Sequence, residues 1–122
     1  GMKGRRKEIT REELHDKLKK GFNSNNIKSE YGMTELLSQA YSNTNGIFKS
    51  PSWLKVLARD INNPLSVNLQ GKGALNFIDL ANINSCSFIA SDDIGEVYQN
   101  SSFKVLGRLS NSEIRGCNLM FN

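Results

Sequence analysis

The sequence contains few residues of the kinds that form covalent or metal-bound frameworks. Its 122 residues include two cysteines, one histidine and two prolines. Cys86 and Cys117 form no CxxC pair and have only His15 for company, so neither a zinc site nor a disulfide framework is expected. The apolar runs are too short for a transmembrane helix, which needs about 20 residues, and no signal-peptide core is present. We therefore expect a cytoplasmic protein with reduced thiols.

Positive charge is in excess only in the N-terminal quarter of the chain. Residues 1–30 contain nine Lys and Arg against five Asp and Glu, whereas residues 31–122 contain seven of each kind. A basic segment can attract nucleic acid. Here, however, the basic residues alternate with acidic ones and no aromatic residues lie among them. This pattern is typical of a solvated helix face, so no nucleic-acid partner is expected.

A helix is predicted from Thr10 to Gly21. Thr10 and Glu13 have the spacing of a capping box, and a glycine suits the C-terminal end. Apolar residues recur at every fourth position and predict a buried stripe, which consists of Leu14, Leu18 and Phe22. His15 has no accompanying catalytic or metal-ligand pattern and is expected to face solvent.

The rest of residues 1–45 predicts a short βα unit, with a strand at Ile27–Glu30, a glycine-containing turn and a helix at Thr34–Ala40. From residue 46 to residue 122, short apolar runs separated by turn residues are typical of antiparallel strands. The predicted strands are Trp53–Arg59, Ala74–Leu80, Cys86–Ala90, Glu96–Tyr98 and Phe103–Leu106. A turn is expected at Asp92–Gly95.

Neither a linker nor a repeat divides the chain, so residues 1–122 are expected to form a single domain. The predicted fold class is α+β. In this prediction the N-terminal helix and the βα unit pack on a small, distorted antiparallel β-barrel, and Cys86 belongs to the core of that barrel.

The segment Tyr31–Glu35 is the best candidate for a binding site. A helix that starts at Thr34 would point backbone N–H groups at an anion. The Thr34 hydroxyl could then bind a phosphate oxygen, and Glu35 could hold a magnesium ion. In the alternative interpretation, Thr34 is only a helix cap and Glu35 only favours the helix dipole. Local physical chemistry alone favours this second interpretation.

Four short motifs extend the argument. The run Tyr31-Gly32-Met33-Thr34-Glu35 resembles the YGxTE motif of adenylate-forming enzymes, the acyl-CoA synthetase and luciferase superfamily. Ser91-Asp92-Asp93-Ile94-Gly95, Gly107-Arg108 and Ile114-Arg115-Gly116 then follow in the order of its TGD, GR and RG motifs. The detailed residue sequence is most similar to the acyl-protein synthetase branch, and phenylacetate-CoA ligases are more distantly similar. The resemblance therefore implies the C-terminal part of a larger adenylate-forming domain.

This resemblance implies a site for ATP or AMP with Mg²⁺. Its nucleotide-binding residues would be Tyr31, Gly32, Met33, Thr34, Asp93 and Arg108. Tyr31 would lie against the adenine, Asp93 would accept hydrogen bonds from the ribose hydroxyls, and Arg108 would approach the ribose or a phosphate. Thr34 would contact the α-phosphate, and Glu35 would bind the magnesium ion.

The catalytic residues implied by the resemblance are Thr34, Glu35 and Cys117. A fatty or aryl carboxylic acid would be converted to an acyl-adenylate, and the acyl group would pass to the Cys117 thiol, because acyl-protein synthetases carry a cysteine near the C-terminus as acyl carrier. A thiol is a strong nucleophile only as the thiolate, which Arg115 could favour. Considered without the resemblance, Cys117 is better explained as a small buried apolar residue.

The Ser/Thr/Gly-rich phosphate loop of the superfamily is not present in this sequence, so we expect no adenylation by this chain alone. The expected partners are the N-terminal portion of such an enzyme, a downstream acyl acceptor or reductase, or a second copy pairing through open strand edges. Two alternatives stay open. The chain could be a catalytically silent module that binds a nucleotide or a protein, or part of an acyl-CoA ligase.

Overall fold

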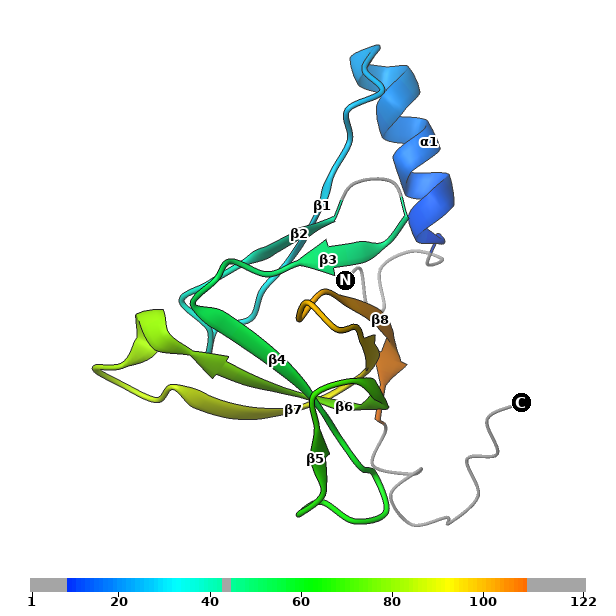
Figure 1. Ribbon diagram of the computed structural model, residues 1–122. Helices are drawn as coiled ribbons and strands as arrows, with labels where there is room; N and C mark the ends of the chain where they lie inside the picture. The colour runs from blue at the N-terminus through cyan, green and yellow to red at the C-terminus, as the bar shows by residue number, and fades with distance from the viewer. Residues whose placement is uncertain (1–8, 43–44, 110–122) are drawn as a thin grey trace.

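A computed structural model describes residues 9–42 and 45–109, which form one α-helix and an eight-stranded antiparallel sheet (Figure 1). The elements, in chain order, are α1 (Arg11–Phe22), β1 (Ser29–Tyr31), β2 (Ala40–Ser42), β3 (Ile47–Lys49), β4 (Leu54–Arg59), β5 (Val67–Asn68), β6 (Gly71–Asp79), the 3₁₀ turn η1 (Leu80–Asn82), β7 (Phe88–Val97) and β8 (Phe103–Arg108). The prediction of an α+β fold with antiparallel strands is therefore confirmed. The described residues contain no helix of the length and apolar character that a membrane span requires.

The sheet does not close into a barrel, so that part of the prediction is wrong. Its strand order is β1-β2-β3-β8-β7-β6-β4-β5, which leaves β1 and β5 as the two edges. These edge strands have three and two residues and do not pair with each other. Register shifts along β7 bend the sheet around its core.

Helix α1 begins where the sequence predicts, because Thr10 and Glu13 form both hydrogen bonds of the capping box. The predicted buried stripe is wrong. Leu14 and Phe22 are 43% and 73% exposed, and Leu18 is half-buried. His15, expected to face solvent, is instead buried, with its Nε2 2.9 Å from Ser29 Oγ. The C-terminal end of the helix projects away from the sheet (Figure 1), so the face toward β1 is used only near the N-terminal end.

Replacement of Thr10 by alanine tests how loosely α1 is attached. Loss of the cap should cost the helix about 1 kcal/mol, which corresponds to about a fivefold faster hydrogen exchange of its amides. The midpoint of global unfolding should stay unchanged, because the sheet core contains no residue of α1. Ser24→Ala is a suitable control beyond the helix. An equal loss of protection from hydrogen exchange in the helix and in the sheet would show that they unfold together.

The predicted helix at Thr34–Ala40 is absent. β1 and β2 pair as an antiparallel hairpin with Tyr31 opposite Ala40, so the intervening residues must reverse the direction of the chain. A single turn forms where the Leu36 N–H donates to the Met33 carbonyl at 3.1 Å. The predicted βα unit is therefore a ββ unit, and Tyr31, placed beyond the predicted strand, ends β1.

The second half follows the predicted strands with one correction. The segments Cys86–Ala90 and Glu96–Tyr98 belong largely to one continuous strand, β7, and the turn predicted at Asp92–Gly95 lies within it. Cys86 precedes β7 and is exposed, so its predicted place in the core is also wrong. The sequence pattern did not reveal the short strands β2, β3 and β5.

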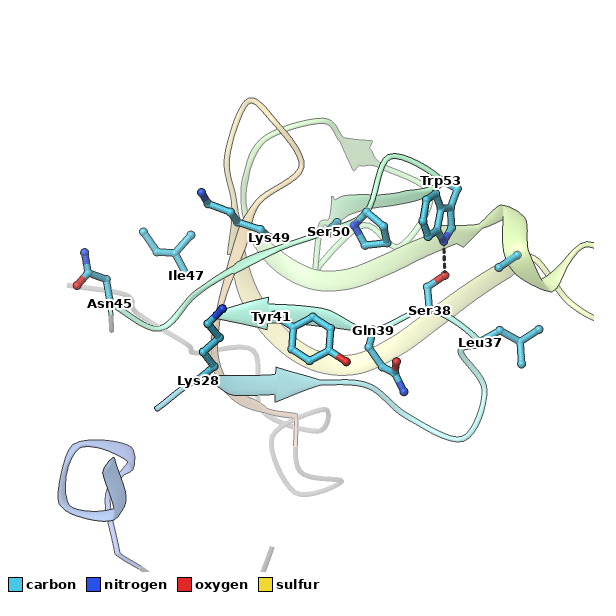
Figure 2. A pocket seen from close by; sticks show the side chains of 12 residues that line it. Lys28, Leu37, Ser38, Gln39, Tyr41, Asn45, Ile47, Lys49, Ser50 and Trp53 are labelled. Atoms are coloured by element: carbon cyan, nitrogen blue, oxygen red, sulfur yellow. Dashed lines mark hydrogen bonds between the residues drawn. The ribbon is translucent and has the colours of Figure 1, made fainter. Parts of the chain in front are cut away.

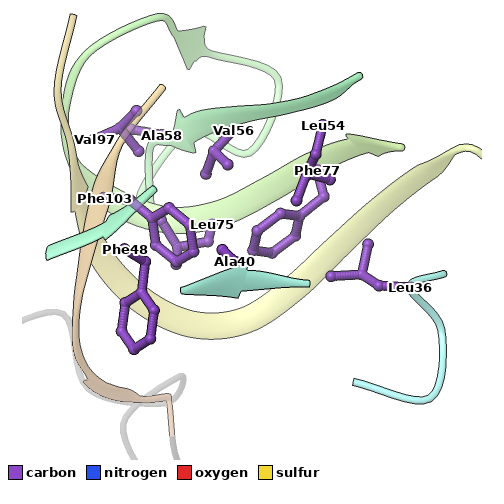
Figure 3. Close-up of a cluster of buried hydrophobic side chains, with 10 residues drawn as sticks. All are labelled: Leu36, Ala40, Phe48, Leu54, Val56, Ala58, Leu75, Phe77, Val97 and Phe103. Atoms are coloured by element: carbon purple, nitrogen blue, oxygen red, sulfur yellow. The ribbon is translucent and has the colours of Figure 1, made fainter. Parts of the chain in front are cut away.

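The core lies on the concave side of the curled sheet and is closed by aromatic rings (Figure 3). Its buried members are Leu36, Ala40, Phe48, Leu54, Val56, Ala58, Leu75, Phe77, Val97 and Phe103. Phe103 packs against Phe48 and Phe77 with ring centroids 5.4 and 6.0 Å apart. Aromatic pairs at such distances stabilise a core beyond the area that they bury. This cluster joins strands from both halves of the sheet.

Candidate functional site

Three polar side chains from separate strands meet at one end of the core. The Tyr31 hydroxyl, at the end of β1, donates to Asp93 Oδ2 at 2.6 Å. Arg108 lies opposite Asp93 in the β7–β8 ladder, and its Nε is 3.8 Å from Asp93 Oδ1. One carboxylate oxygen thus has a neutral donor, and the other faces a guanidinium group that is largely exposed.

An irregularity in β7 aims Asp93 into this position. Asn76 pairs with Ala90 and Ala74 pairs with Ile94, so Leu75 alone stands opposite Ser91, Asp92 and Asp93. The Ser91 hydroxyl stabilises the bulge by donating to the Leu75 carbonyl at 2.8 Å and accepting from the Asp93 N–H at 3.2 Å. Bulges of this kind redirect side chains and occur often beside active sites.

Gly95 explains why this part of β7 resembles a turn in the sequence. A Cβ atom at Gly95 would lie 2.6 Å from the Lys104 carbonyl oxygen and 2.8 Å from Leu75 Cδ2. The glycine is therefore required by the close approach of β8 and the core, and not by a reversal of the chain.

The ring of Tyr31 is part of the core. It stacks on Phe77 at 5.6 Å, meets Phe103 edge-on at 5.1 Å and contacts Phe48 at 5.7 Å. Burial raises the pKa of Tyr31 above its ordinary value, and the hydrogen bond to Asp93 raises it further. The hydroxyl therefore stays protonated at neutral pH and remains a donor to Asp93.

A pocket of about 440 Å³ opens beside Asp93. Its lining combines the loop after β1, the bulged part of β7 and the end of β8, and comprises Met33, Thr34, Glu35, Ile89, Ala90, Ser91, Asp92, Asp93 and Arg108. Five of the residues that the sequence singled out thus share one pocket, although they come from distant parts of the chain. Tyr31 lies behind Asp93, and Gly32 joins Tyr31 to the loop.

Thr34 and Glu35 do not occupy the start of a helix. Both are exposed and lie in the turn between β1 and β2, so the expected anion site at a helix N-terminus is absent. The Glu35 carbonyl accepts a hydrogen bond from Asn82 Nδ2 at 2.8 Å, which ties the turn to η1. Any phosphate contact at this turn must therefore come from side chains and loop amides.

Asp79 fixes the part of the β1–β2 loop that precedes β2. Its carboxylate is fully buried and accepts hydrogen bonds from the backbone N–H groups of Leu37, Ser38 and Ala81 and from the Ser38 hydroxyl, at 2.7 to 3.1 Å. Burial by itself would raise the pKa of Asp79, but these four hydrogen bonds outweigh it and hold the pKa below its usual value. Asp79 therefore stays ionised and fixes the loop that carries Thr34 and Glu35.

No group of three or more His, Cys, Asp or Glu side chains in residues 9–42 and 45–109 is arranged to hold a metal ion. The pocket nevertheless has three carboxylates in its lining, those of Glu35, Asp92 and Asp93. Magnesium is commonly bound by only one or two carboxylates together with substrate phosphates and water. The oxygen donors present therefore suit magnesium when a phosphate ligand completes its coordination.

Some predicted features lie outside the described residues, namely Cys117 and the motif Ile114-Arg115-Gly116. Other important residues escaped the sequence analysis, including Asp79 as the loop anchor, Ser91 as the support of the bulge and His15 as a buried contact. Their roles depend on partners far away in the chain, and no local spacing signals them.

Comparison of the chain with family models, with curated proteins and with solved structures found no match.

Proposed function

We propose that this chain is the nucleotide-binding C-terminal part of an ATP-dependent acyl-activating enzyme of the acyl-protein synthetase type. Such an enzyme forms an acyl-adenylate and transfers the acyl group to a cysteine thiol. One observation carries the proposal. Residues of the YGMTE, SDD and GR motifs, which lie far apart in the sequence, line a single pocket with Asp93 and Arg108 side by side.

Asp93 is suited to bind a ribose. Tyr31 occupies one face of the carboxylate, and the 3.8 Å separation from Arg108 Nε is longer than a hydrogen bond. Oδ1 is therefore available to accept from the hydroxyl groups of a sugar. Arg108, with 69% of its side chain exposed, would reach a phosphate by charge-assisted hydrogen bonds. Together they would hold the ribose and the phosphate of an AMP unit.

Tyr31 would act on the nucleotide through Asp93. Because three phenylalanine rings surround its own ring, we assign it the orientation of the carboxylate instead of the expected stacking on adenine. Tyr31→Phe keeps the ring and removes only the donor. The variant should bind AMP about tenfold more weakly, in line with the loss of one hydrogen bond to a charged group. Calorimetric titration measures this, and unchanged affinity would contradict the assignment.

Of the three carboxylates in the lining of the pocket, we assign that of Glu35 to magnesium. Glu35 would hold the ion, which would supply positive charge against the negative charge of the phosphates. The Thr34 hydroxyl, next to Glu35 in the same turn, would donate to the α-phosphate. Both residues are held in place by the anchoring of their loop to Asn82 and Asp79.

Acyl transfer would use the Cys117 thiolate, which attacks the acyl carbonyl carbon. A thioester bond forms, the bond between the acyl carbon and the phosphate oxygen breaks, and AMP leaves with its electron pair. The proton of the thiol passes to water. This part of the proposal depends on the sequence resemblance alone.

Hydrogen exchange with and without AMP tests the nucleotide site directly. AMP should slow the exchange of amides in residues 31–36 and 90–94, and leave those of β5 unchanged as an internal control. Inorganic phosphate at the same concentration should protect less, because it cannot engage Asp93. Absence of protection at both segments would refute the nucleotide site.

Intact mass spectrometry tests the transfer step separately. Incubation with a preformed acyl-adenylate bypasses the missing phosphate loop and should give one hydroxylamine-labile acyl adduct. The adduct should be absent from Cys117→Ser and present in Cys86→Ser, which removes the exposed cysteine. An adduct that survives in Cys117→Ser would refute the carrier role. If AMP protects but no adduct forms, the silent nucleotide-binding module is the better description.

A further inference from the structure

A second cavity lies outside the hairpin of β1 and β2. It has a volume of about 1010 Å³ and is bordered by β2, β3 and the segment that leads into β4 (Figure 2). We call it the Trp53 groove and define it by Lys28, Leu37, Tyr41, Ile47, Lys49 and Trp53. It shares no lining residue with the pocket beside Asp93.

The floor of the Trp53 groove is apolar and exposed. Trp53, Tyr41 and Leu37 are 52%, 49% and 66% exposed, although each could bury a large apolar area. Exposed aromatic and aliphatic side chains that gather in one concave site mark a binding surface more often than a solvated one.

Trp53 is held in the groove from within the protein. Its indole Nε1 donates to Ser38 Oγ at 2.9 Å, and Ser38 Oγ donates in turn to the buried carboxylate of Asp79 at 2.7 Å. The polar atom of the indole is thus satisfied internally, while the ring remains accessible. A ring fixed in this way loses little conformational entropy when a ligand packs against it.

The two lysines of the groove lie at the end opposite Trp53. Figure 2 shows Lys28, Ile47 and Lys49 toward one end, Trp53 and Leu37 toward the other, and Tyr41 between them. Neither lysine has an ion-pair partner within residues 9–42 and 45–109. The nearby carboxylate of Glu30 hydrogen-bonds with Tyr41 and thereby raises the pKa of that tyrosine. The groove therefore offers positive charge at one end and large apolar side chains toward the other, with the polar residues Ser38, Gln39 and Ser50 also in its lining.

We propose that the Trp53 groove binds an elongated amphiphilic anion, with its apolar body along Tyr41 and Trp53 and its anionic head between Lys28 and Lys49. The charge complementarity of the lysine end and the preset indole at the other end support this occupant. The head group is a carboxylate or a phosphate, both of which attract ammonium groups. This inference is independent of the nucleotide site.

Trp53 is the only tryptophan in the chain, so its fluorescence reports on the groove alone. The full chain is titrated with decanoate, decyl phosphate and decyltrimethylammonium below their micelle concentrations. At least one of the two anions should give a saturable change, and their comparison identifies the preferred head group. The cation has a matched apolar body and should give no saturable change. AMP in excess should not displace the anion.

Two double variants separate specific binding from general attraction of charge. Lys28→Gln with Lys49→Gln should weaken anion binding at least tenfold. Lys55→Gln with Lys72→Gln removes the same charge from strands outside the groove and should change affinity less than twofold. Ile47→Glu places a negative charge at the lysine end and should abolish binding, while circular dichroism checks that the variants fold.

Four results would overturn the proposal: no saturable change with either anion, equal binding of the cation, equal effects of the two double variants, or displacement by AMP. A change that depends only on protein concentration would assign the groove to a second copy of the chain. Binding of an acidic apolar peptide without binding of either amphiphile would assign it to a protein partner. Both of these results would also refute the proposed ligand.

Discussion

Asp93→Ala should reduce the affinity for AMP by about 100-fold. In the proposed complex this carboxylate accepts from both ribose hydroxyls, and each hydrogen bond to a charged acceptor contributes about 1.5 kcal/mol or more. The loss of two such bonds, about 3 kcal/mol, corresponds to a factor of about 100. Calorimetric titration measures the affinity, and hydrogen exchange shows whether protection of residues 31–36 disappears with it.

The controls for this prediction come from the chain itself. Asp93→Asn keeps the shape of the side chain and an acceptor for Tyr31, but removes the charge. Its affinity for AMP should therefore lie between those of wild type and Asp93→Ala. Asp16→Asn removes a carboxylate from the exposed face of α1 and should bind AMP as wild type does. If Asp93→Ala remains folded and binds AMP within twofold of wild type, the ribose role is refuted.

Asp79→Asn should lower the free energy of unfolding by about 3 kcal/mol at pH 7, because an amide places its own donors against N–H groups that now bind carboxylate oxygens. The corresponding fall in the melting temperature is about 10 °C for a domain of this size. Urea unfolding followed by circular dichroism gives the free energy. The substitution should also loosen the loop that carries Thr34 and Glu35, and thus speed its hydrogen exchange.

The effect of Asp79→Asn should depend on pH in a defined direction. The pKa of Asp79 is lower in the folded protein than in the unfolded chain, so the folded state favours the ionised form. That stabilisation is complete above the unfolded pKa, near 4, and is lost as the pH falls through the lower folded value. The difference between wild type and variant should therefore be constant from pH 7 to 5 and shrink by pH 3.

Asp60→Asn provides the matched control for pH and charge. Asp60 is exposed and, among the residues that the structure describes, accepts only from the backbone N–H groups of Asn62 and Asn63 in its own turn. Its replacement should change stability by about 0.5 kcal/mol or less. The difference in the free energy of unfolding between wild type and Asp79→Asn could instead grow toward pH 3. The folded protein would then favour the protonated form of Asp79, which contradicts the hydrogen bonds described.

Local signals in the sequence predicted the elements whose causes are local. The helix at Arg11–Phe22 followed from its capping box, because both partners lie within one turn. The helix expected at Thr34–Ala40 failed because Asp79, 41 positions beyond Ser38, binds the backbone amides of this segment in a non-helical turn. A side chain that is distant in the sequence can hydrogen-bond backbone amides in place of a helix. A short window of sequence does not contain that side chain and therefore cannot predict its effect.

The candidate site could likewise be predicted only in part, because some of its contacts join residues that are far apart in the sequence. Motif resemblance drew attention to Thr34, Glu35, Asp93 and Arg108, and the fold brings all four to one pocket. The bond between Tyr31 and Asp93 joins residues 62 positions apart and could not be read from spacing. Likewise, Asp92–Gly95 has the composition of a turn, and only the approach of β8 to Gly95 explains its place within a strand.

The pairing of β3 with β8 determines when the molecule can assemble. β8 alone links the β1–β2–β3 half of the sheet to the β4–β7 half, and the ladder brings Phe48 opposite Phe103 from half a chain away. Contacts between such distant segments slow folding, because a long loop must close first. During synthesis, the β3–β8 ladder and the contact between Phe48 and Phe103 can therefore form only after β8 has been made. Until then Phe48 lacks one of its aromatic partners, and apolar surface exposed in this way makes a folding intermediate prone to aggregation.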